Sequence, residues 1–292
     1  MSGAIGFIGL GVMGEPMCRN LAQKSGRPVI GFDRADAPLE RLAAVGVTRA
    51  TSLAALAQAC DVIFMALPSG AHVEAVTLGE HGLIPHVRPG TILVDLGTSP
   101  VELTRAIAAR FAEQGATYAD APIARTRQAA EEGTLSIMVG ADDAIYGQIH
   151  PLLATFASDI TLCGPVGAGQ IVKILNNMVL VETVVALSEA IATARRAGVD
   201  GKLLFETLMK GSADSFALRN HGMKAIVPDT FPERAFSTSY ARKDISYALS
   251  LAGSVGLKLE GAELADRLLA RTQEAGLADL YWPAVSRIIA DA

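Results

Sequence analysis

The sequence contains few cysteines and no cluster of the residues that usually bind metals. Its three cysteines, Cys18, Cys60 and Cys163, lie far apart without a C-x-x-C pair, so neither a disulfide framework nor a zinc site is predicted. The five histidines, at positions 72, 81, 86, 150 and 221, are scattered and show no ligand spacing. We therefore expect no metal centre and a reducing compartment, the cytoplasm.

Basic runs are also absent. With a formal net charge of -5, the chain has no row of cations for successive phosphates, and we expect no nucleic-acid partner. No basic segment precedes the apolar start, so we expect no signal peptide. The most apolar helical stretch, residues 178–194, contains Glu182 and Glu189, which favours a buried helix over a membrane span. We therefore expect no membrane partner.

Short apolar runs alternate with helical patterns from the start of the chain to about Cys163. This alternation is typical of βαβ units and predicts a doubly wound, mostly parallel sheet. After Gly164 and Pro165 the spacing becomes helical, over about residues 168–197, 202–210, 244–255, 261–275 and 282–290. The predicted fold is α/β: an N-terminal Rossmann-type domain, residues 1–164, followed by an all-α domain, residues 165–292.

A glycine motif connects the first predicted strand, residues 4–8, to a helix. Gly9, Gly11 and Gly14 occupy the G-x-G-x-x-G positions, with Val12 and Met13 between them. In this motif the glycines permit a tight turn, close approach of phosphate and close packing of helix and strand. The free N–H groups at the start of the helix then bind an anion. We therefore predict a dinucleotide-binding loop formed by these five residues.

A second strand, residues 28–32, ends at Asp33. This position, about twenty residues after the glycine loop, is where the motif places the acceptor for the ribose hydroxyls. A carboxylate there favours NAD and repels the additional phosphate of NADP. Arg34 follows directly and could bind a 2′-phosphate, so use of NADP stays possible.

Lys173 and Asn177 lie four residues apart on the first predicted helix of the second domain. This spacing brings both side chains to one helical face. Hydride transfer to a carbonyl creates negative charge on oxygen, and an ammonium group can stabilise that charge and donate the proton. The alternative is a structural lysine whose head group reaches the surface.

The motifs taken together resemble the β-hydroxyacid dehydrogenase family, the group of 3-hydroxyisobutyrate dehydrogenase and tartronate semialdehyde reductase. The resemblance covers the chain in order, through GFIGLGVMGEPM, DAPIARTRQAAEEGTLSIMVG, GAGQIVKILNN and RKDISYAL. It implies a catalytic role for Lys173, with Asn177 positioning the lysine and the substrate. It also implies homodimers or homotetramers with active sites between the domains.

The same resemblance implies four further cofactor contacts. Thr98 and Lys243 match cofactor-binding positions, and Leu67 and Pro68 match the loop over the adenosine side. Without the resemblance, Thr98 is better explained as part of a helix cap, Lys243 as a surface charge, and Leu67 with Pro68 as the end of a strand.

The predicted substrate loop departs from the family pattern. Ala124, Arg125 and Thr126 replace the usual Ser-Gly-Gly. A guanidinium suits a carboxylate, sulfonate or phosphate because it presents several donors in one plane. The loop resembles that of sulfolactaldehyde reductases, which makes a sulfonated aldehyde a candidate substrate. The alternative is that Arg125 points to solvent or pairs with Glu131 or Glu132.

These residues predict an oxidoreductase that transfers a hydride between NAD(H) and a small anionic 3-hydroxy acid or its semialdehyde. The alternatives are a sulfolactaldehyde reductase, an imine reductase, and a cofactor-binding module without catalysis. Lys173 argues against imine reduction, because relatives that reduce imines lack this lysine. The exact substrate, the direction of the reaction and the choice between dimer and tetramer stay open.

Overall fold

The computed structural model describes residues 3–233 and 235–291. The chain forms two compact units, residues 1–173 and 174–292, which we describe separately. The long helix α8 (Ala168–Arg196) begins in the first unit and continues in the second. The predicted domains, residues 1–164 and 165–292, assign this whole helix to the second part, and that division stays a prediction.

The first unit is built on one sheet, whose strands are ordered β3-β2-β1-β4-β5-β6-β8-β7, with β9 paired to β8. The strands from β3 to β6 are parallel, and β8 is antiparallel to β6 and β7. Their bounds are β1 (Ala4–Ile8), β2 (Val29–Phe32), β3 (Thr48–Arg49), β4 (Cys60–Met65), β5 (Ile92–Asp95), β6 (Thr117–Asp120), β7 (Ile123–Ala124), β8 (Leu135–Gly140) and β9 (Ala157–Gly164). The order reverses between β1 and β4, where parallel α/β sheets bind ligands beyond the carboxyl ends of the strands.

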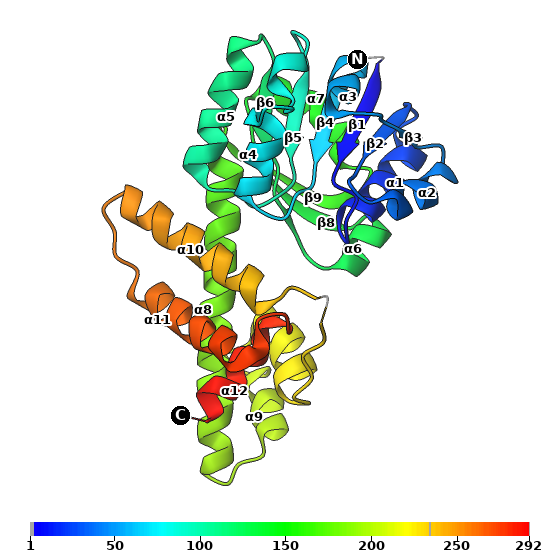
Figure 1. The fold of residues 1–292 in the computed structure, drawn as a ribbon. Helices are drawn as coiled ribbons and strands as arrows, with labels where there is room; N and C mark the ends of the chain where they lie inside the picture. The colour runs from blue at the N-terminus through cyan, green and yellow to red at the C-terminus, as the bar shows by residue number, and fades with distance from the viewer. Residues whose placement is uncertain (1–2, 234, 292) are drawn as a thin grey trace. The chain divides into compact units, whose positions relative to one another are not determined.

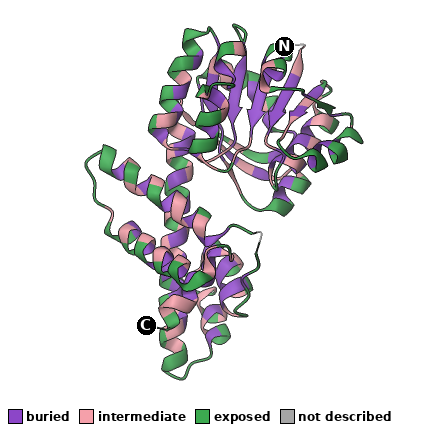
Figure 2. Cartoon of the chain, in the orientation of Figure 1, coloured by how far each residue is buried: buried purple, intermediate pink, exposed green. Residues whose placement is uncertain are grey.

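Helices cover both faces of this sheet (Figure 1). The helices of the unit are α1 (Gly14–Lys24), α2 (Asp36–Ala43), α3 (Leu53–Ala59), α4 (Gly70–Leu78), η1 (Ile84–His86), α5 (Val101–Glu113), α6 (Arg127–Glu132) and α7 (Asp143–Leu153). Consecutive residues of one strand belong to different cores: Phe64 packs with α1, α2 and α7, whereas Ile63 packs with α3, α4 and α5. This is why the strands are continuously apolar in sequence and buried in Figure 2. The predicted doubly wound sheet is confirmed.

The second unit is helical among the residues described. Besides most of α8 it contains α9 (Gly201–Leu208), η2 (Leu218–Ile226), α10 (Thr238–Ser254), α11 (Glu260–Thr272), η3 (Gln273–Leu277), η4 (Trp282–Ala284) and α12 (Val285–Ala290). Its core joins Val181, Val184 and Ile191 of α8 to Leu269 and Trp282. Helix α8 is the one described helix long and apolar enough to cross a membrane. Helices in the core of a soluble protein meet the same criteria, so this is weak evidence for a span.

Two elements of this unit differ from the predicted helices. Helix α10 begins at Thr238, six residues before the predicted start at 244, because the Ser237 side chain accepts a hydrogen bond from the Tyr240 N–H at 3.3 Å. The segment around residues 218–226, which the sequence pattern left unassigned, forms the π-helix η2. The turns of a π-helix are wider than those of an α-helix, so its residues do not follow the α-helical period, and the sequence pattern does not predict this helix.

Candidate active site

Two glycines of the predicted cofactor loop are required by close packing of the backbone. Gly9 has a φ of +86°, and a Cβ atom on it would lie 2.3 Å from the Ala66 carbonyl oxygen. A Cβ atom on Gly14 would lie 1.8 Å from the Gly9 carbonyl oxygen. The turn from β1 into α1 therefore depends on the absence of a side chain at both positions.

Gly11, the third glycine, is not required by any close contact among the described residues. A Cβ atom on Gly11 would meet no described atom within 4 Å, and Val12 beside it is 54% exposed. The start of α1 at Met13 has no side-chain cap, whereas the Asp142 carboxylate caps α7 by accepting from Ile145 N. The open space and the uncapped helix start fit the pyrophosphate of a dinucleotide.

Asp33 is held in place at the carboxyl end of β2. One carboxylate oxygen accepts a hydrogen bond from Leu10 N at 2.6 Å, and the other accepts from Ala35 N at 2.8 Å. The side chain is therefore fixed beside the glycine loop, as a ribose acceptor must be. Arg34, next in the chain, is exposed.

The other predicted cofactor residues of this unit follow β4 and β5. Leu67 and Thr98 are half-buried, and Pro68 is exposed. Because β1, β2, β4 and β5 are parallel neighbours, the loops at their carboxyl ends share one edge of the sheet. The structure thus brings the predicted glycine loop, Asp33, Leu67, Pro68 and Thr98 to that edge.

Two buried carboxylates lie under this edge, at the ends of β5 and β6. Asp95 and Asp120 are paired in the sheet register, and both have no exposed surface. Asp95 accepts hydrogen bonds from Gly97 N at 2.9 Å, Ser99 Oγ at 3.1 Å and Tyr118 OH at 3.0 Å. Burial nevertheless raises the pKa of Asp95 to about 6. The sequence analysis did not select either carboxylate.

The Asp120 carboxylate fixes the start of α8. It accepts hydrogen bonds from Gly167 N at 2.6 Å and Gln170 N at 2.8 Å. Burial raises the pKa of Asp120 to about 6, although these amide bonds favour its charged form. A Cβ atom on Gly140 would lie 2.3 Å from the Asp120 carboxylate, so the glycine at the end of β8 leaves room for it.

Arg125 already has partners within its own unit. Its guanidinium donates to Thr134 O at 2.6 Å and Ser158 Oγ at 3.0 Å, and forms an ion pair of 2.7 Å with Asp159. This residue has a φ of +85°, in the left-handed region that favours glycine. The acidic partner is therefore Asp159, neither of the two glutamates considered from the sequence.

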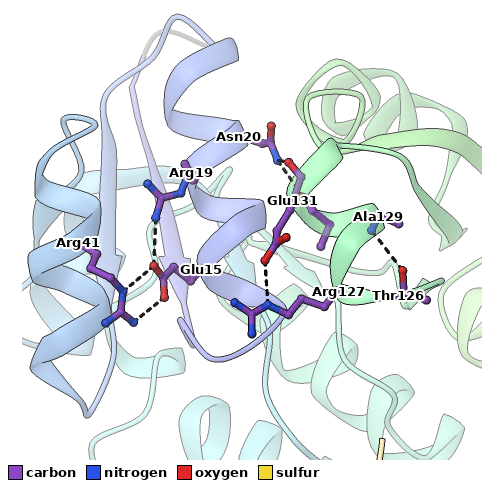
Figure 3. A network of polar contacts seen from close by, with 9 residues as sticks. Glu15, Arg19, Asn20, Arg41, Thr126, Arg127, Ala129 and Glu131 are labelled. Atoms are coloured by element: carbon purple, nitrogen blue, oxygen red, sulfur yellow. Dashed lines mark hydrogen bonds and ion pairs between the residues drawn. The ribbon is translucent and has the colours of Figure 1, made fainter. Parts of the chain in front are cut away.

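Those glutamates pair within α6 itself. Glu131 accepts from Arg127 Nε at 2.8 Å (Figure 3). Glu132 accepts from Gln128 Nε2. Thr126 caps the same helix, its hydroxyl accepting from Ala129 N at 3.3 Å (Figure 3). Ala124 ends β7 directly before the loop. The three predicted substrate-loop residues thus form the connection from β7 to α6, whereas Lys173 and Asn177, also predicted to bind substrate, lie on α8.

Helix α6 is tied to the cofactor-loop helix α1 by a buried amide (Figure 3). Asn20 Nδ2 donates to Ala130 O at 2.9 Å, the two residues being 110 positions apart. On the outer side of α1, Glu15 accepts two hydrogen bonds from Arg41 and one from Arg19. Arg41 and Arg19 lower the pKa of Glu15, which keeps this first-turn residue charged.

Lys173 and Asn177 lie on one continuous helix, α8, as predicted. Lys173 is half-buried, and Asn177 is 6% exposed. Asn177 Nδ2 donates to the Asp244 carboxylate at 2.6 Å, and Lys243 Nζ lies 3.2 Å from the other oxygen of that carboxylate. The sequence analysis missed Asp244 because it placed this residue at the start of a helix, whereas the residue lies within α10 and is 2% exposed.

Lys243 lies on α10 between two aromatic rings. Its Nζ is 5.4 Å from the ring centre of Tyr240 and 5.3 Å from that of Tyr247. Such contacts hold an ammonium group over the ring faces. Lys243 belongs to the second unit, whereas the other predicted cofactor residues belong to the first. Among the described residues, no three His, Cys, Asp or Glu side chains are placed to hold a metal ion.

Two family models match the chain. Residues 4–164 match the NAD binding domain of 6-phosphogluconate dehydrogenase, and residues 167–289 match the NAD-binding domain of NADP-dependent 3-hydroxyisobutyrate dehydrogenase. Together the matches support NAD(P) as the cofactor.

Individual proteins similar to this chain are dehydrogenases and reductases of the same kind. The chain is 36% identical to 2-(hydroxymethyl)glutarate dehydrogenase of Eubacterium barkeri, over 86% of this chain and 83% of that protein. It is 35% identical to 2-hydroxy-3-oxopropionate reductase of Escherichia coli, over 87% and 86%. The structure of Mycobacterium tuberculosis 3-hydroxyisobutyrate dehydrogenase with L-serine is similar at a TM-score of 0.89, with 30% identity and 99% of both chains covered.

The two kinds of glycine predict different effects of alanine. Gly14→Ala forces a Cβ atom against the Gly9 carbonyl and should destabilise the fold by about 1–3 kcal/mol. Gly11→Ala should change the free energy of unfolding by less than about 1 kcal/mol, yet weaken NADH binding at least ~10-fold, because the backbone must approach the pyrophosphate there. Urea unfolding and NADH fluorescence titration measure both effects. A Gly11→Ala protein that binds NADH like wild type would place the pyrophosphate elsewhere.

The buried Asp95 carboxylate predicts a pH dependence of stability. Its pKa is about 6 in the folded protein against an ordinary 3.8, so its contribution is complete below pH 3.8 and is lost as the pH rises through 6. Asp95→Asn does not titrate. Between pH 4 and pH 7, wild type should therefore lose of the order of 3 kcal/mol relative to this variant in urea unfolding. A constant difference across that range contradicts the assignment.

Proposed function

The chain belongs to the β-hydroxyacid dehydrogenase family, and from this premise we propose that Lys173 is the proton donor and acceptor of its reaction. The family assignment makes the protein an NAD(P)-dependent dehydrogenase that acts on the CH–OH group of small hydroxy acids.

The nicotinamide cofactor, when bound, supplies or accepts the hydride. In reduction, the carbonyl carbon gains that hydride while the Lys173 ammonium donates its proton to the oxygen, which becomes the hydroxyl. In oxidation the neutral Lys173 amine takes the hydroxyl proton as the C–H bond gives up its hydride. Asn177, one turn along the same helix, positions the lysine and the substrate oxygen.

The observation that best supports this proposal is the hydrogen bond from Asn177 to Asp244. A carboxylate accepts only, so the Asn177 NH₂ group must face Asp244 and its Oδ1 must face away. Asn176 Nδ2 donates to this Oδ1 at 3.1 Å. The amide therefore has one defined orientation one turn from Lys173, which is what a positioning residue requires.

We propose NAD as the preferred cofactor, with NADP as the alternative. The proposed contacts are the loop Gly9, Gly11, Val12, Met13 and Gly14, with Asp33, Leu67, Pro68, Thr98 and Lys243. The fixed carboxylate of Asp33 supports NAD. Arg34 is exposed and is the residue that would accept a 2′-phosphate.

The proposed substrate is a small 2-substituted 3-hydroxypropanoate or its semialdehyde. The names of similar proteins include 2-(hydroxymethyl)glutarate, 3-hydroxyisobutyrate and L-serine, and each of these compounds is a carboxylate with a hydroxymethyl group on the adjacent carbon. This shared chemistry favours a carboxylate over the sulfonate of sulfolactaldehyde.

Arg125, with Ala124 and Thr126, is proposed to bind the substrate's anionic end. Its ion pair with Asp159 is exposed, at 41% and 57% for the two side chains. Exposed pairs of this kind contribute only about 0–1 kcal/mol. Exchanging Asp159 for a substrate anion therefore costs little free energy.

The other functions are less well supported. Imine reductases such as that of Pseudomonas share the fold at a TM-score of 0.62 and 18% identity, which carries no information on the reaction. A cofactor-binding module without catalysis would have no need for the Lys173 and Asn177 pair. We also propose a homodimer or homotetramer in the cytoplasm, without a nucleic-acid or membrane partner.

Replacing the proposed proton donor should abolish most turnover. Lys173→Ala should lower kcat by about 10²–10⁴-fold, because general acid–base catalysis contributes an effect of this size. NADH affinity should stay close to wild type. Lys202→Ala, which removes an exposed lysine of α9, is the matched control and should keep full activity. A Lys173→Ala enzyme with nearly wild-type turnover would exclude the assignment.

The role of Arg125 is tested with tartronate, methylmalonate and succinate semialdehydes and 3-sulfolactaldehyde. Arg125→Ala should raise KM for the preferred anion by about 10- to 100-fold, through loss of charged hydrogen bonds of roughly 1.5–3 kcal/mol. Arg127→Ala is the matched control, because that arginine is two residues away and 67% exposed. If both variants behave alike, Arg125 does not bind substrate. A preference for the sulfonate would replace the carboxylate proposal.

A further inference from the structure

One side chain joins the loop that contains Thr98 to the helix that contains Lys173. Gln170, in the first turn of α8, has no exposed surface. Its Nε2 donates to Gly97 O at 2.9 Å, and its Oε1 accepts from Ser99 N at 3.0 Å. Gln170 therefore binds the backbone on both sides of Thr98 while lying three residues before Lys173.

Both ends of this connection are fixed by buried carboxylates. Asp95 holds the Thr98 loop through Gly97 N and Ser99 Oγ, and Asp120 holds the helix start through Gly167 N and Gln170 N. Burying two carboxylates side by side costs free energy that apolar side chains would not. The two carboxylates thus hold the Thr98 loop and the start of α8 through hydrogen bonds.

The helix start has no room to move in compensation. A Cβ atom on Gly169 would lie 2.3 Å from Met138 O on β8, so the backbone of α8 already lies against the sheet. Gln170 therefore forms its two hydrogen bonds to the Thr98 loop from a helix start whose backbone is packed closely against β8.

We propose that Gln170 is a positioning residue for hydride transfer. It sets the placement of Thr98, a proposed cofactor contact, relative to Lys173, the proposed proton donor. This inference rests on the proposed function. Loss of the Gln170 hydrogen bonds should disturb the alignment of the cofactor with the proton donor. Binding of the dinucleotide through the glycine loop and Asp33 should be preserved.

The first variant is Gln170→Met, which keeps the length of the side chain but removes both hydrogen bonds. We expect kcat to fall by about 10- to 100-fold, since misplacing reacting groups by about 1 Å has effects of this size. The isotope effect with NADH deuterated at the transferred position should increase, and NADH affinity should change less than about threefold. Thr77→Val is the control, because it removes a hydrogen bond of an equally buried side chain, to Val73 O, in the same unit.

The second variant, Gln170→Glu, supplies a test by pH. A protonated glutamic acid can donate to Gly97 O and accept from Ser99 N, as the amide does, whereas the ionised form loses the donor. The kcat of this variant relative to wild type should therefore recover as the pH falls. Among the described residues, the titratable or charged groups near this position include Asp95 on β5, Tyr118 and Asp120 on β6, Arg105 on α5, Cys163 on β9 and Lys173 on α8.

The outcomes separate the two proposals. A wild-type protein that turns over none of the semialdehydes would overturn the proposed function, and the positioning role with it. An active wild type whose Gln170→Met variant matches Thr77→Val in kcat and isotope effect would overturn the positioning role alone. A Gln170→Glu enzyme whose activity relative to wild type does not change with pH would do the same. If Gln170→Met does not fold, the pH profile of Gln170→Glu decides.

Discussion

The need to satisfy two carboxylates that have no contact with water shapes the candidate active site. Asp95 and Asp120 are neighbours in the sheet, and their oxygens are bonded to the backbone of the Thr98 loop and of the first turn of α8. If either carboxylate lost its donors, a buried charge would be left without compensation. The local backbone is therefore held in one conformation, and this fixes the positions from which the side chains of Thr98 and Lys173 extend.

Four glycines permit the close backbone contacts around the site. Gly9, Gly14, Gly140 and Gly169 lie where a Cβ atom would meet a carbonyl or carboxylate oxygen at less than 3 Å. They allow close approach of α1 to the end of β1, of that end to the residue after β4, of β8 to β6, and of α8 to β8. Gly11 differs because the space above it is open. The rigid part of the site is thus built by backbone contact, and the open part is left for the dinucleotide.

Much of the fold could be predicted from the sequence because its signals are local. The apolar run at residues 4–8 and the glycine motif predicted β1 and the turn into α1, and the apolar spacing after residue 168 predicted α8. The start of α10 and the π-helix η2 could not be predicted in this way, because they depend on a cap at Ser237 and on a non-standard helical period. The site residues joined by long-range contacts were missed for a related reason. Asp95, Asp120 and Asp244 lie at strand ends or within a helix, and their importance comes from burial and from partners distant in sequence.

The left-handed backbone at Arg125 bears on how such a loop acquires new specificity. The main chain there has the shape that a glycine favours, and glycine is the residue that the family pattern carries at this position. The arginine adopts this conformation at a cost of about 1–2 kcal/mol. Because glycine adopts this conformation without strain, exchanging Arg125 for glycine would remove the positive charge while the backbone keeps its conformation. The same reasoning makes residue 125 a natural point at which to exchange side chains when altering substrate preference by design.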